Sequence, residues 1–173
     1  AIISNAVTGE DALRLAKEMM TGDDVAKSSF SKIYDLLRAL DKVGMYDEYA
    51  LPLLSQWDKM VEKHCTTWCE STDFPRSECH GWSCTPVYEM TSKILGVTPM
   101  ENGFEKVKIE PHLMGLTYAK GRVPTGYGYI DVSWKLDGDK FSIDISSSKE
   151  VEMEIILPDG KKVTTKAKDY SIA

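Results

Sequence analysis

Along the first part of the chain, hydrophobic residues recur every three or four positions, the spacing that gathers them on one face of a helix. This pattern predicts helices up to residue 96. Thr8 with Asp11 forms a predicted capping pair for the first helix, and Gly22 and Gly44 are the predicted ends of the first two. A third helix contains Pro52, which is tolerated only in a first turn or at a kink.

A fourth predicted helix begins at Ser83, which we expect to act as its N-cap, and ends at Gly96. Val87, Met90 and Leu95 supply its apolar face. The four helices therefore predict two antiparallel pairs.

From Phe104 onward the period of the pattern falls to two, which is typical of half-buried strands. The tripeptides Asp-Gly-Asp at 137–139 and Pro-Asp-Gly at 158–160 are hairpin signals between such strands. The predicted fold class is α+β. Residues 1–96 form a helical part and residues 97–173 form an antiparallel β-sandwich, with the junction at the start of the second part.

Composition narrows the function classes. The 173 residues are 42% hydrophobic and 28% charged, which is ordinary for a globular protein with a real core. The net charge of -6, without any Lys/Arg cluster, argues against nucleic acid as a partner. No apolar run approaches the roughly 20 residues of a membrane span, so we expect no membrane partner. A cytoplasmic and a periplasmic or secreted location both stay open.

The segment from His64 to Pro86 concentrates the candidate chemistry between two predicted helices. It contains the carboxylate of Glu70, the imidazole of His80 and the rings of Trp68 and Trp82. Sugars offer hydroxyls to polar groups and C–H faces to aromatic rings, so this set suits a carbohydrate site. The simpler alternatives are a solvated acid, a structural histidine and two core tryptophans.

All four cysteines lie in the same segment, at positions 65, 69, 79 and 84. A zinc site completed by His64 or His80, a disulfide, and free thiols are the alternatives. Zinc sites usually bring ligands in closer C-x2-C pairs, and we predict no metal and no cofactor.

Ordered motifs over roughly the last two thirds of the chain resemble the bacterial α-L-rhamnosidases, glycoside hydrolase family 78. The matching segments are Thr-Thr-Trp-Cys-Glu at 66–70, Cys-His-Gly-Trp-Ser at 79–83, Gly-Val-Thr-Pro at 96–99, the run from Gly103 to His112, and Val-Pro-Thr at 123–125 followed by Gly128, Ile130, Val132 and Trp134.

The resemblance implies that residues 1–96 are the last helices of an (α/α)6 catalytic barrel and that the strands form the domain that follows it. It also implies inverting hydrolysis of terminal α-L-rhamnosyl groups, with Glu70 at the position of the base and His80 at that of a sugar-contacting histidine. Trp82 and Trp68 are the candidate stacking rings.

Two departures from the family pattern matter. The tryptophan that directly precedes the family's glutamate is Cys69 here, with Trp68 one place earlier. The family's proton donor and acidic cluster have no counterpart after Ala1, so we expect a missing upstream barrel and a fragment that is inactive alone. An unfinished barrel also predicts an exposed apolar patch or a homo-oligomer that covers it.

Two other function classes stay open. One is a carbohydrate-binding accessory module without catalysis, in which the sandwich binds the ligand. The other is a small zinc-stabilised interaction domain. The partner expected on the first reading is a rhamnose-containing glycan or glycoside.

Overall fold

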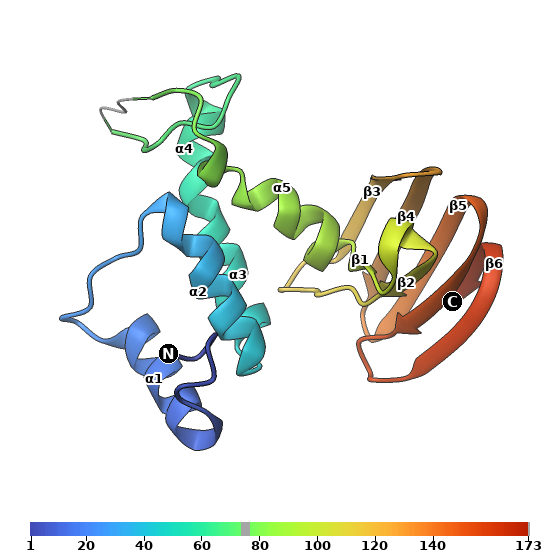
Figure 1. Ribbon diagram of the computed structural model, residues 1–173, viewed down its shortest axis with the longest axis horizontal. Helices are drawn as coiled ribbons and strands as arrows, with labels where there is room; N and C mark the ends of the chain where they lie inside the picture. The colour runs from blue at the N-terminus through green and yellow to red at the C-terminus, as the bar shows by residue number, and fades with distance from the viewer. Residues whose placement is uncertain (74–76, 173) are drawn as a thin grey trace. The chain divides into compact units, whose positions relative to one another are not determined.

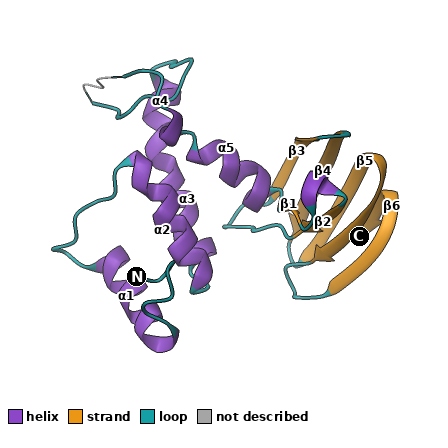
Figure 2. Ribbon diagram, viewed as in Figure 1, coloured by secondary structure: helices purple, strands orange, loops and turns teal. Residues whose placement is uncertain are grey.

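The computed structural model describes residues 1–73 and 77–172. The chain divides into two compact units, Ala1–Pro86 and Val87–Ala173, which we call the helical unit and the sheet unit. Figures 1 and 2 show that the described strands all belong to the sheet unit, so helix and strand are segregated along the chain as the hydrophobic pattern predicts. The α+β class is confirmed.

Two helices of 13 residues begin the helical unit, α1 (Gly9–Thr21) and α2 (Phe30–Lys42). Thr8 is the N-cap residue of α1, but its side chain makes no capping hydrogen bond. Asp11 instead pairs with Arg14 at 3.0 Å. The predicted capping pair is therefore wrong, because the acid is engaged one turn further along the helix.

The end of α2 is a Schellman motif centred on Gly44, as the glycine predicts. Gly44 has φ of 73°, its N–H donates to the carbonyl of Asp41, and the N–H of Met45 donates to the carbonyl of Leu40 at 2.9 Å. Glycine adopts the left-handed conformation that this closure requires without steric strain.

The third predicted helix is interrupted. It consists of α3 (Tyr46–Leu54), the 3-10 turn η1 (Ser55–Trp57) and α4 (Asp58–Glu62). Pro52 lies inside α3 beyond its first turn, and the regular helix ends two residues later.

The fourth predicted helix is short and irregular. The 3-10 turn η2 (Gly81–Ser83) precedes α5 (Thr85–Glu89), and a π-helical turn, η3 (Met90–Ile94), follows it. The Ser83 hydroxyl is buried and has no hydrogen-bond partner among the described residues, so the expectation that it caps the helix is wrong.

Six strands form one sheet in the order β1-β2-β5-β4-β3, with β6 also paired to β5. Their bounds are β1 (Val97–Pro99), β2 (Lys106–Ile109), β3 (Tyr118–Thr125), β4 (Gly128–Asp137), β5 (Lys140–Ile156) and β6 (Lys162–Ile172). The short 3-10 turn η4 (Asn102–Phe104) lies between β1 and β2.

Both predicted hairpins are confirmed, between β4 and β5 and between β5 and β6. The expectation of a purely antiparallel arrangement is wrong, because β2 pairs with β5 in parallel. The reason lies in β5, a single strand of 17 residues. An irregularity between Ser146 and Val151 lets its first half pair with β4 and its second half with β2.

The core of the sheet unit lies on one face of these strands. Ile130, Val132 and Trp134 of β4 are all at most 1% exposed, while the residues between them face outward. The indole N–H of Trp134 donates to the carbonyl of Ile94 at 2.7 Å, which joins η3 to the sheet. None of the described helices is both long and apolar enough to cross a bilayer.

Candidate active site

The motif segment leaves α4 through another left-handed residue, His64. Its φ is 54°, its N–H donates to the carbonyl of Val61, and the N–H of Cys65 donates to that of Met60. This is the closure seen after α2, with histidine in place of glycine. His64 therefore ends the helix and turns the chain toward the motif.

Two arms of the segment then lie side by side, held by backbone hydrogen bonds. The N–H of Glu70 donates to the carbonyl of Ser77 at 2.9 Å, and the N–H of His80 donates to the carbonyl of Trp68 at 2.7 Å. The Thr67 hydroxyl adds a contact to the carbonyl of Glu78. The arms thus bring the first motif, 66–70, beside the second, 79–83.

Three of the four predicted site residues are directly linked. Trp68 and His80 share the backbone hydrogen bond, and the His80 ring meets the Trp82 ring edge to face, with centroids 4.9 Å apart. Trp82 is 65% exposed, which leaves most of its ring open to a ligand. Glu70 is half-buried two residues after Trp68, in the same arm.

The base of the segment is anchored in the helical core by Trp57, which is 3% exposed. Its indole N–H donates to the carbonyl of Ser83 at 2.8 Å, and its ring lies 4.5 Å from the ring of Phe30. This buried hydrogen bond fixes the end of the second motif against α2.

Cys69 is 6% exposed between the half-buried Trp68 and Glu70. Its thiol lies 3.7 Å from that of Cys65, and burial followed by this hydrogen bond raises the pKa of Cys69. All four cysteines are free thiols in the structure. Within residues 1–73 and 77–172, no group of three or more His, Cys, Asp or Glu side chains is placed to hold a metal ion.

Two small hollows flank this segment. One of about 180 Å³ is lined in part by Trp68, and one of about 300 Å³ by Cys65, Cys69 and Glu78. The described linings include neither Glu70 nor His80. The arrangement therefore supplies an exposed aromatic and an adjacent imidazole and acid, but the helical unit alone does not enclose them.

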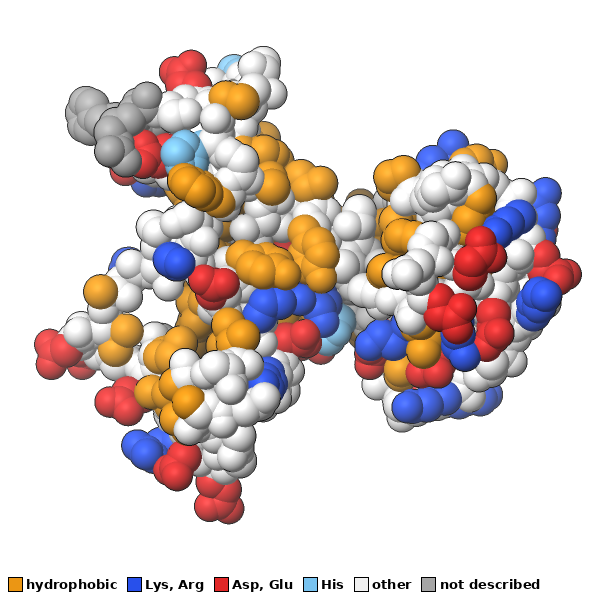
Figure 3. All heavy atoms as spheres, in the orientation of Figure 1, with side chains coloured by type: hydrophobic (Ala, Val, Ile, Leu, Met, Phe, Trp, Pro, Cys, Tyr) orange, Lys and Arg blue, Asp and Glu red, His pale blue; other side chains and the backbone are white. Residues whose placement is uncertain are grey.

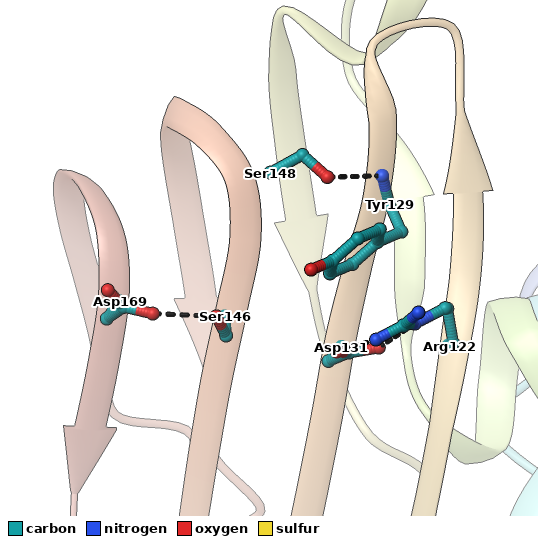
Figure 4. Close-up of polar contacts among 6 residues, drawn as sticks. All are labelled: Arg122, Tyr129, Asp131, Ser146, Ser148 and Asp169. Carbon is teal, nitrogen blue, oxygen red and sulfur yellow. Dashed lines mark hydrogen bonds and ion pairs between the residues drawn. The ribbon is translucent and has the colours of Figure 1, made fainter.

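A larger hollow, of about 640 Å³, lies on the sheet unit and was not predicted from the sequence. The signal that could have found it is the row of alternating polar residues in β3 to β6. Figure 4 shows the contacts among some of these side chains.

The comparisons with known proteins confirm the resemblance to the C-terminal part of the bacterial α-L-rhamnosidases. Residues 96–171 match the family described as the bacterial alpha-L-rhamnosidase C-terminal domain. An alpha-L-rhamnosidase of Alteromonas sp. (strain LOR) is 39% identical over 66 residues, which are 38% of this chain and 7% of that protein.

Solved structures extend the likeness to nearly the whole chain. The GH78 family rhamnosidase of Bacillus sp. GL1 is 27% identical with a TM-score of 0.79, over 92% of this chain and 18% of that one. The alpha-L-rhamnosidase of Dictyoglumus thermophilum, 21% identical, shares the fold with a TM-score of 0.80 over 98% of this chain and 24% of that one. This chain thus spans less than a quarter of each relative.

Proposed function

We propose that this chain is the C-terminal part of an inverting α-L-rhamnosidase that removes terminal α-L-rhamnosyl groups from glycans or glycosides. In this proposal residues 1–96 are the last helices of an (α/α)6 barrel and residues 97–173 a β-sandwich domain. The observation that supports it is the hairpin-like pairing of the two motifs, in which the arm of Trp68 and Glu70 is hydrogen-bonded to the arm of Ser77 and His80.

The proposed chemistry assigns one role to each of these residues. Glu70 takes a proton from a water molecule as that water attacks the anomeric carbon. A second carboxylic acid, in the missing upstream barrel, protonates the departing oxygen on the opposite face, roughly 6.5 to 9.5 Å away. His80 holds a sugar hydroxyl, and the exposed ring of Trp82 and the ring of Trp68 cover the apolar face of the sugar.

This division of roles makes the isolated chain inactive, because it supplies the base without the acid. Catalysis by a positioned general base is typically worth 10² to 10⁴-fold. The full-length protein with Glu70→Gln is therefore expected to lose about a thousandfold in kcat and to keep its KM for an aryl α-L-rhamnoside.

Glu78→Gln is the matched control, since Glu78 is an exposed acid in the facing arm of the same segment. It is expected to leave kcat within about twofold of the parent. Equal losses in both variants, or none in Glu70→Gln, would remove Glu70 from the reaction. The anomer released first, followed by proton NMR, is expected to be β-L-rhamnose, and α-L-rhamnose would contradict inversion.

The alternative of an accessory module without catalysis is supported by the hollow on the sheet unit. It differs from the first proposal in where a saccharide binds.

A further inference from the structure

The outer face of the sheet unit carries two rows of polar side chains that run across four strands. Strand register places Arg122 opposite Asp131, Asp131 opposite Ser146, and Ser146 opposite Asp169. Two residues away along each strand runs a parallel row. We call the eight side chains the polar groove: Lys120, Arg122, Asp131, Ser133, Asp144, Ser146, Asp169 and Ser171.

The rows border a hollow of about 640 Å³, a size within the usual range of ligand sites. Short side chains such as Ser133 and Ser146 stand on the two central strands. The long side chains of Lys120 and Arg122 stand on β3 at one edge. Because the central side chains are short and those on β3 are long, the surface is lower over the central strands than at the β3 edge.

Most polar groups in the groove are already oriented by a neighbour. The Ser146 hydroxyl donates to Asp169 and the Ser171 hydroxyl donates to Asp144, both at 2.6 Å. Because each hydroxyl proton is directed to a carboxylate, the oxygen lone pairs that remain are acceptors with fixed positions. A ligand rich in O–H donors would meet them without reordering the site.

One edge of the groove is stiffened by a stacked pair (Figure 4). Arg122 donates to both carboxylate oxygens of Asp131, at 2.7 and 2.8 Å, while its guanidinium carbon lies 3.7 Å from the centroid of the Tyr129 ring. The Tyr129 N–H in turn donates to the Ser148 hydroxyl at 2.9 Å. The half-buried ring therefore packs against the guanidinium and holds this edge of the groove in place.

Charge narrows the ligand class. The groove has three carboxylates against two cations, and one of the cations is committed to Asp131. This balance disfavours phosphates and acidic sugars. Among the described residues no three carboxylates are placed to hold a metal ion, so a cation is not the ligand that the geometry favours.

We propose that the polar groove is a binding site for a neutral saccharide, separate from the segment that contains Glu70. The site deepens the carbohydrate-related function proposed above but uses none of the residues given a role in hydrolysis. A second sugar site on the same polypeptide would hold a branched or polymeric substrate near the enzyme by raising its local concentration.

The test is a titration of the 173-residue chain, labelled with ¹⁵N, with L-rhamnose and with the neutral trisaccharide maltotriose. Amide shifts are expected at 120–122, 131–133, 144–146 and 169–171, with a Kd of about 1 to 10 mM for at least one sugar. No groove shifts with either sugar, or shifts confined to residues 64–86, would overturn the inference. The second pattern would leave the proposed hydrolytic site intact.

Variants make the assignment specific. Asp144→Asn keeps the shape of the side chain but removes its charge, and Ser146→Ala removes one oriented hydroxyl, so each is expected to weaken binding about tenfold. Lys166→Ala is the matched control, because Lys166 is an exposed charge on β6 that pairs with Glu150 outside the groove. It is expected to bind like the parent, as is Glu70→Gln.

Unchanged affinity in both groove variants would overturn the site. Loss of affinity in Glu70→Gln would instead move the sugar to the motif segment. Spectra that stay superimposable outside the groove show that the variants are folded, and Ser146→Ala, a small change on the surface, is the variant least able to disturb the sheet.

Discussion

Two thiols lie within reach of each other directly before the proposed base. The Cys65 and Cys69 sulfurs are 3.7 Å apart, whereas a disulfide bond is about 2.0 Å long, so the two thiols are neighbours but not bonded. Cys65 is exposed and Cys69 is buried with a raised pKa, which makes Cys65 the thiol that an oxidant meets first.

We expect the oxidant diamide to join Cys65 to Cys69, taking one hydrogen from each thiol and being reduced to the hydrazine. Peptide mass spectrometry should then find a cross-linked pair lacking two hydrogens. A variant without Cys79 and Cys84 should behave in the same way, and Cys69→Ser should instead keep a diamide adduct on Cys65. Oxidation without a 65–69 cross-link would contradict the expectation.

The pair of Arg122 and Asp131 makes a pH-dependent contribution to stability. Hydrogen bonds from Arg122 lower the pKa of Asp131 in the folded chain. A lowered pKa stabilises the fold above the ordinary value, and this contribution is lost as the pH falls through the folded pKa. Because both side chains are well exposed, the effect is small.

Asp131→Asn is accordingly expected to lower the Tm by about 2 °C or less at pH 7, and the difference from the parent is expected to shrink as the pH falls below the ordinary range of a carboxyl pKa. Thermal unfolding followed by circular dichroism at several pH values measures this. Asp137→Asn is the control, since Asp137 lies on the same strand with 80% of its side chain exposed. A difference between Asp131→Asn and the parent that grows toward acid pH would reverse the assigned sign.

The sequence locates the candidate residues of the motif segment but not their spatial arrangement, and the carbohydrate chemistry assigned to them stays a prediction. Residue types alone indicate a carbohydrate site around Glu70 and His80. The pairing of Trp68 with His80 depends on a hydrogen bond between residues twelve positions apart, which no local pattern encodes. The polar groove was not predicted for the same reason, because the register between strands is set by the whole sheet.

Among the elements, regular periodicity was predictable and irregular geometry was not. The hairpin turns and the glycine end of α2 follow local rules. The parallel pairing of β2 with β5 depends on an irregularity in β5. The fourth predicted helix changes to a π-helical turn. Leu95, which follows this turn, is buried in the core of the sheet unit, while Val87 and Met90 stay exposed. Tertiary packing, not local sequence, determines both the parallel strand pairing and the π-helical turn.

Gly96, the residue before β1, has no space for a side chain and adopts a left-handed backbone conformation. Its φ is 78°, and a side-chain carbon placed there would lie 2.3 Å from the carbonyl carbon of Glu110 and 2.4 Å from the nitrogen of Pro111. The N–H of Glu110 also donates to the Gly96 carbonyl. The close approach brings β1 onto β2 and requires glycine.

Gly96→Ala is therefore expected to lower the free energy of unfolding of the sheet unit by about 3 kcal/mol, since left-handed strain adds to a backbone clash that no rotamer relieves. Urea unfolding followed by far-ultraviolet circular dichroism measures it. Gly138→Ala is the matched control: its φ is 61°, but open space surrounds it, so it should cost only about 1 kcal/mol. Equal costs would show that the clash is relieved by backbone movement.

On a larger scale, the helical unit exposes several hydrophobic side chains. Figure 3 shows hydrophobic side chains among acidic and basic ones on the face in view. In the helical unit, Val25 and Val61 are 42% and 67% exposed. A hollow of about 490 Å³ beside Val25 is lined partly by Met19, Met20, Leu36 and Leu53.

Such a surface follows from the proposal that residues 1–96 complete a barrel begun upstream, whose helices would cover it. Without them, exposed apolar area drives association. Static light scattering of the 173-residue chain is expected to give a weight-average mass that rises with concentration. Val25→Asp, a change in a loop at the edge of this hollow, should reduce the rise, because a charge there must be desolvated when two copies meet.

Tyr118→Asp is the matched control, since Tyr118 is 72% exposed but belongs to the sheet unit. If apolar exposure anywhere on the molecule drove association, both variants would reduce it equally. If the helical unit alone is incomplete, only Val25→Asp will do so. Joining the upstream barrel should then abolish association in the parent, and a parent chain that stays monomeric at every concentration would weaken the idea that its helices are the remainder of a larger barrel.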